Sequence, residues 1–127
     1  MIHIKGHRFL LYLCLTLLLF GCSNKGEDTP ILELTITSDK ETVKIDEVFT
    51  LTAKVIYGNK DISEGTTVEF EFIENGMSLG AVNPSYVGDG VYELEMKLLS
   101  TGEHIIVAHV SYEEIYQTDF ITFNVEE

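Results

Sequence analysis

Apolar and polar residues alternate in six segments of the chain after residue 30. A repeat of two residues places one side of a segment in a hydrophobic core and the other side in solvent, which is typical of β-strands. No window carries the sustained repeat of 3.6 residues that an amphipathic helix needs. The six segments are residues 32–36, 49–57, 68–72, 92–98, 106–112 and 121–125.

Turn-forming residues separate these segments. Gly, Asn, Asp, Ser and Pro gather at residues 38–39, 58–60, 64–65, 74–76, 83–84 and 88–90, and these residue types favour reversals of the chain. Short strands with turns at intervals of about 8–12 residues predict a β-sandwich. We therefore expect residues 31–127 to form one all-β domain, an immunoglobulin-like β-sandwich of about seven antiparallel strands.

The histidines of this domain, His104 and His109, stand at an odd spacing. On a regular strand they face opposite sides, so they do not bind one metal ion together. Gly102 and His104 occupy the place where such sandwiches often carry a glycine, one further residue and a tyrosine that holds the preceding corner. We expect His104 to be a structural corner residue.

His109 is then expected on the outer face of the same strand, beside Ile105 and Val107. The neighbouring strand offers Glu69 and Glu71 on that face. Apolar residues on an outer face indicate either a covering loop or a contact surface. His109 with Glu69 or Glu71 is also a candidate site for a divalent cation, against the simpler interpretation that the glutamates are solvated charges.

The N-terminus has the pattern of a secretory signal. Lys5 and Arg8 precede an uncharged apolar run at residues 9–20, which is followed by Gly21 and Cys22. A positive region, an apolar region and a small residue before the cut describe such a signal, whereas a mature membrane-spanning helix needs about 20 apolar residues. The segment around Gly21 and Cys22 resembles the bacterial lipobox, which implies cleavage after residue 21 and acylation of Cys22. The alternative is an uncleaved N-terminal anchor.

Cleavage after residue 21 would change both the number of cysteines in the mature chain and its net charge. Cys14 would leave with residues 1–21, and Cys22 would carry lipid, so no disulfide and no thiolate chemistry are expected in the domain. The polar residues 22–30 are expected to be a flexible tether. The chain has 21 Asp and Glu against 8 Lys and Arg, a formal charge of −13, which becomes −15 once Lys5 and Arg8 are removed. This charge argues against nucleic acid as a partner, because phosphate binding relies on clustered Lys and Arg.

Residues 32–125 resemble the YtkA-like domain family, which is related to FixH-like domains. The matching segments are 46–55, 58–62, 67–72, 88–92 and 101–110, the last with the triplet Ala108, His109 and Val110. The resemblance implies a small secreted or lipid-anchored bacterial domain, and a Met- and His-rich hairpin with a soft-metal or copper site after that triplet. Residues 112–117 instead read Tyr-Glu-Glu-Ile-Tyr-Gln, with neither Met nor His.

Three tyrosines are candidate contacts with a protein partner. Tyr86, Tyr112 and Tyr116 belong to expected loops, and tyrosine offers a large contact area and a hydroxyl group at a small entropic cost. The alternative is that these rings cap the ends of the core.

No catalytic motif occurs in the sequence. We therefore expect a non-catalytic binding or accessory module without a cofactor, anchored by lipid at the outer side of a bacterial membrane and meeting a protein partner. The alternatives are metal handling at His109 and a spacer domain with no ligand of its own.

Overall fold

The computed structural model describes residues 29–127. The signal peptide expected at residues 1–21, the lipidation site Cys22 and nearly all of the tether at 22–30 lie outside these residues. Within the described part of the chain, no helix is long and apolar enough to cross a membrane.

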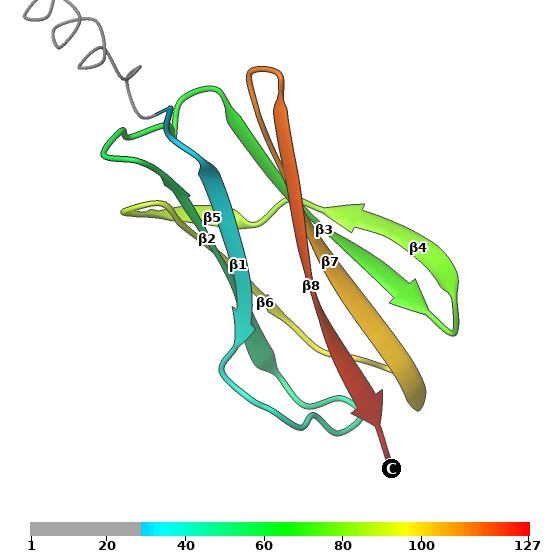
Figure 1. The fold of residues 1–127 in the computed structure, drawn as a ribbon. Coiled ribbons are helices and arrows are strands. Elements are labelled where there is room, and N and C mark those ends of the chain that lie inside the picture. Colours follow the sequence, from blue (N-terminus) through cyan, green and yellow to red (C-terminus); the bar gives the residue numbers. More distant parts are fainter. Residues whose placement is uncertain (1–28) are drawn as a thin grey trace, which may run out of the picture.

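Within residues 29–127, eight strands form two antiparallel sheets that pack face to face (Figure 1). One sheet has the order β1-β2-β6-β5 and the other β4-β3-β7-β8. The strands are β1 (Leu32–Ser38), β2 (Phe49–Tyr57), β3 (Thr66–Glu74), β4 (Met77–Val82), β5 (Ser85–Gly88), β6 (Val91–Met96), β7 (Gly102–Tyr112) and β8 (Ile115–Val125). The predicted immunoglobulin-like β-sandwich is confirmed.

The core lies between the sheets and follows the alternation of the sequence. In β2 and β7 every second side chain is buried, as the repeat of two residues predicts. Phe49 of β2 and Phe123 of β8 meet across the two sheets, with ring centroids 5.1 Å apart. Apolar side chains from both sheets therefore fill one continuous core.

Two of the eight strands, β4 and β5, lie outside the six alternating segments. All six side chains of β4 are exposed, so this edge strand has no buried face to produce an alternating pattern. The turn before β4 contains Asn75 and Gly76, whose φ angles are 49° and 81°. An Asn-Gly pair with positive φ is the usual two-residue connection of a β-hairpin, and it fixes the register between β3 and β4.

Strand β8, at the other edge of the sheet β4-β3-β7-β8, makes a hydrogen bond to the opposite sheet. The Oδ2 atom of Asp119 in β8 accepts a hydrogen bond from the backbone N–H of Ile36 in β1, at 3.0 Å. An inward-pointing carboxylate on an edge strand satisfies a backbone donor and also discourages pairing with another chain. The contact fastens β8 to β1 along one side of the sandwich.

Candidate functional site at the outer face of the second sheet

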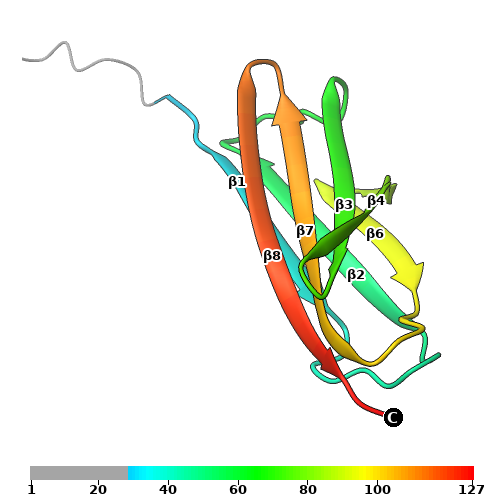
Figure 2. The ribbon, with the colours of Figure 1, turned by 90° about the vertical axis from the view of Figure 1, so that its right-hand side faces the viewer.

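The outer face of the sheet β4-β3-β7-β8 carries His109, Glu69 and Glu71, which the sequence predicts to lie on one face. Figure 2 looks onto this face, with β8, β7 and β3 side by side and the other sheet behind them. Across β3 and β7, His109 pairs with Glu69, Val107 with Glu71, and Ile105 with Ile73. We call this surface the outer face; its β8 residues are Tyr116, Thr118, Phe120 and Thr122.

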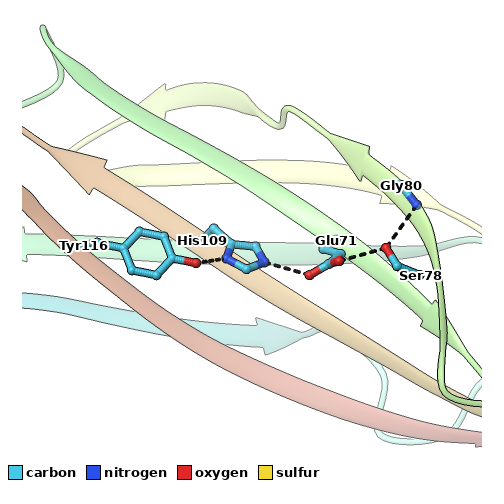
Figure 3. A network of polar contacts seen from close by, with 5 residues as sticks. All are labelled: Glu71, Ser78, Gly80, His109 and Tyr116. Atoms are coloured by element: carbon cyan, nitrogen blue, oxygen red, sulfur yellow. Dashed lines mark hydrogen bonds and ion pairs between the residues drawn. The ribbon is translucent and has the colours of Figure 1, made fainter.

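A chain of polar contacts crosses all four strands of the sheet (Figure 3). The Tyr116 hydroxyl in β8 bonds to Nδ1 of His109 in β7. Nε2 of His109 lies 2.9 Å from Oε1 of Glu71 in β3. The Ser78 hydroxyl in β4 donates to Oε2 of Glu71 at 2.7 Å, and the N–H of Gly80 points at that hydroxyl from 3.4 Å.

These contacts show which group donates and which accepts each hydrogen bond. A carboxylate only accepts hydrogen bonds, so His109 donates its Nε2–H to Glu71. In the neutral ring Nδ1 is then the acceptor, and Tyr116 donates its hydroxyl proton to it. The Ser78 hydroxyl and, second, His109 hold the pKa of the Glu71 carboxyl below its ordinary value of 4.5, because both donate hydrogen bonds to its charged form.

Exposed aromatic side chains lie next to this polar chain. The residues Phe120 and Tyr116 are 65% and 56% exposed, whereas Val107, which pairs with Phe120 across β7 and β8, is half-buried. The ring of Tyr116 stacks on His109 with centroids 5.8 Å apart and an interplanar angle of 28°. The outer face thus combines rings held in place by hydrogen bonds with an open apolar surface.

The order Tyr116, His109 and Glu71 has the form of a nucleophile, a base and a group that orients the base. Catalysis would also require a hollow that binds substrate and excludes water. Two hollows of the described domain are lined by other residues, and Tyr116 is exposed to solvent.

The candidate metal site at His109 is only partly assembled. His109 and Glu71 meet, but Glu69, although directly opposite His109 in the register, has no hydrogen bond to the ring. Among residues 29–127, no three His, Cys, Asp or Glu side chains lie close enough together to hold a metal ion. Both ring nitrogens of His109 are engaged within the protein.

The other histidine has the structural position that the sequence predicts. His104 is 6% exposed and faces the interior. Its Nε2–H donates to the carbonyl oxygen of Ser100 at 2.9 Å, which ties the start of β7 to the preceding turn. The Ser100 hydroxyl in turn donates to the Glu74 carboxylate.

The three candidate tyrosines have different surroundings. Tyr112 is half-buried at the end of the core, where its ring lies 5.3 Å from that of Tyr57. Tyr86 is 44% exposed and lies 5.0 Å from the buried ring of Tyr92. The loop positions predicted for the three tyrosines are wrong, because Tyr86, Tyr112 and Tyr116 belong to strands β5, β7 and β8. The strand backbone therefore fixes the directions in which their side chains leave it.

Sequence reasoning missed Phe120, Ser78 and the contact between Tyr116 and His109. The signal for that contact was present, because the two-residue turn Glu113–Glu114 pairs Tyr112 with Ile115 and so places Tyr116 near His109. Ser78 gave no comparable signal, since a bulge at residues 72–73 shifts the register between β3 and β4.

Comparisons with known proteins support the fold. No family model matches the sequence, and no curated protein matches it significantly. Among solved structures, the chain is similar to an endo-β-1,4-mannanase from Thermotoga petrophila (TM-score 0.59, 18% identity, 82% of this chain and 22% of that chain). It is also similar to an engineered protein (TM-score 0.59, 13% identity, 76% of this chain and 20% of that one).

A third similar structure has nearly the size of this domain. It is the PmoD soluble domain from Methylocystis sp., with a TM-score of 0.52, 10% identity, and coverage of 77% of this chain and 97% of that domain. The chain spans about a fifth of the length of the first two proteins. At these sequence identities the comparisons bear on the fold alone, and they support a β-sandwich domain.

Proposed function

We propose that this chain is a bacterial lipoprotein whose β-sandwich is a non-catalytic binding module, and that it meets a protein partner through the outer face. The observation that carries the proposal is the pair of exposed rings, Phe120 and Tyr116. They lie beside His109, whose ring is hydrogen-bonded to both Tyr116 and Glu71. Interfaces are enriched in aromatic residues that lie on a rigid support.

The charge of the surroundings indicates the partner's chemistry. Glu69 and Glu71 lie on the outer face, and the chain as a whole carries −13. A partner with an apolar patch flanked by basic or neutral groups complements this surface, whereas a phosphate-rich partner is repelled.

The anchor is proposed from the sequence. Cys22, acylated after cleavage behind Gly21, would hold the domain at the outer side of the bacterial membrane. Replacing Cys22 by Ala should release the domain from the membrane fraction or leave an unprocessed precursor. Normal cleavage and membrane fractionation of the Cys22→Ala variant would contradict the lipid anchor.

Cross-linking of intact cells tests the binding role. The wild-type chain should form one discrete adduct, Phe120→Ser should lose most of it, and Thr35→Ala, at an exposed position of β1 in the other sheet, should keep it. An adduct that survives Phe120→Ser would place the interface elsewhere. The absence of any adduct in all three chains would favour a spacer domain.

A further inference from the structure

A second surface feature, separate from the outer face, is a hollow beside the sheet β1-β2-β6-β5. Its volume is about 350 Å³, and it lies between the end of β2 with the following loop at residues 58–63 and the β5–β6 hairpin. Pockets that bind small ligands begin at about this size.

The two walls of the hollow are fixed by contacts of their own. On one side, Ile62 is 7% exposed and anchors the loop in the core, and Oδ1 of Asp61 accepts the N–H of Ser63 at 3.0 Å. On the other side, the N–H of Val55 donates to the carbonyl of Gly90 at 2.8 Å. Gly90, with φ 75°, approaches so closely that a Cβ would lie 2.3 Å from the Val55 oxygen. The hollow is therefore formed before any ligand arrives.

Three tyrosines are among the residues that line the hollow. Tyr57, Tyr86 and Tyr92 all contribute, and the Tyr86 hydroxyl accepts the N–H of Gly90 at 3.4 Å, which directs its ring along the wall. The face of a tyrosine ring carries negative electrostatic potential and attracts cations.

Carboxylates add to this potential. Asp61 and Asp89 both line the hollow. Burial, and after it the negative charges that Tyr86 and Asp61 carry when ionised, raise the pKa of the Tyr92 hydroxyl, so this ring is uncharged at neutral pH. Lys60 is the one cation among the lining residues, and its Nζ lies 6.0 Å from the centroid of the Tyr57 ring.

We propose that this hollow binds an alkylammonium group, which rests on the tyrosine rings and pairs with the carboxylates of Asp61 and Asp89. Lys60 shows the same chemistry within the chain, since its ammonium already lies at cation–π distance from Tyr57. It is thus an internal competitor for the ligand.

Titrations of the full chain, purified in a neutral detergent, test the proposal by NMR. The probes are Nα-acetyl-lysine methylamide, cadaverine, the neutral analogue Nα-acetyl-norleucine methylamide and methyl glucoside. The first two should shift the amide signals of residues 55–63 and 86–92 with Kd values of about 1 mM, and the two neutral probes should not. Tighter binding of the lysine derivative would indicate a peptide side chain as the source of the ammonium group, and tighter binding of cadaverine a free polyamine.

Four variants separate binding from folding. Tyr86→Ala should weaken binding about fivefold and Asp61→Asn about threefold, while Tyr116→Ala on the outer face should leave it unchanged. Lys60→Gln should strengthen binding about threefold because it removes the competing ammonium, an effect that a merely structural role would not produce. Equal binding of the lysine and norleucine probes, binding of the glucoside alone, or no shift with any probe would overturn the proposal.

Discussion

Nε2 of His109 lies 2.9 Å from Oε1 of Glu71, and this contact joins β7 to β3 on the outer face. It is the middle link of the chain that begins at Tyr116 and ends at Ser78. Because the sheet backbone places each of these residues, the side chains form a rigid surface at a small entropic cost on binding.

The Glu71 link predicts a change in acid stability. The pKa of Glu71 is lowered first by Ser78 and then by His109, so its contribution to folding is present above the ordinary pKa of about 4.5. That contribution is lost as the pH falls through the lower pKa of the folded state. Urea unfolding of Glu71→Gln should therefore show a smaller loss of stability between pH 6 and pH 3 than the wild type.

Glu93→Gln is the matched control for this measurement, because Glu93 is exposed on β6 in the other sheet. It should keep the acid sensitivity of the wild type. If Glu71→Gln and the wild type lost stability equally, the hydrogen bonds to Glu71 would not contribute to the fold.

Two phenylalanines of β8 should differ sharply in their effect on stability. Phe123 is 3% exposed and contacts Phe49, whereas Phe120 is 65% exposed. Phe123→Ala should lower the free energy of unfolding by about 3–5 kcal/mol, and Phe120→Ala should change it by less than about 0.5 kcal/mol. Urea denaturation of the full chain measures both. A large loss for Phe120→Ala would mean that its ring supports the fold instead of being available to a partner.

The alternation of apolar and polar residues, together with the turn residues, predicted which residues of β3 and β7 share the outer face. They placed Glu69 and Glu71 beside the outward residues of β7, and the register between β3 and β7 confirms this arrangement. They did not predict which glutamate meets His109. Glu69 is directly opposite His109, but the ring contacts the diagonal neighbour Glu71, and strand register alone does not distinguish these two partners. Strand β4 was missed because none of its side chains is buried.

Asp119 should control the opening of the sandwich along β1 and β8. Its carboxylate accepts the N–H of Ile36, so Asp119→Ala leaves a part-buried donor without a partner, which costs about 1–3 kcal/mol. Hydrogen exchange at the Ile36 amide should become faster in that variant. Asp119→Asn keeps an acceptor and should exchange at nearly the wild-type rate. Unchanged exchange in Asp119→Ala would show that the contact does not hold the two strands together.

Zinc and copper should have little effect on His109. Nε2 and Nδ1 both take part in hydrogen bonds. A metal ion would have to displace one of these bonds, and residues 29–127 place no third ligand close by. Titration with micromolar Zn²⁺ or Cu²⁺ should leave the NMR signals of the His109 ring in place. Shifts that disappear in His109→Ala would contradict this expectation and favour the metal-handling function.

Position-specific photo-crosslinking in intact cells tests the binding role of the outer face most directly. A photoreactive phenylalanine at position 120 replaces an exposed ring by a similar one, and the same group at position 35 in β1 serves as the control on the opposite sheet. We predict one discrete protein adduct from position 120 and none from position 35. Adducts of equal yield from both positions, or an adduct from position 35 alone, would contradict the proposal that the outer face is the partner surface.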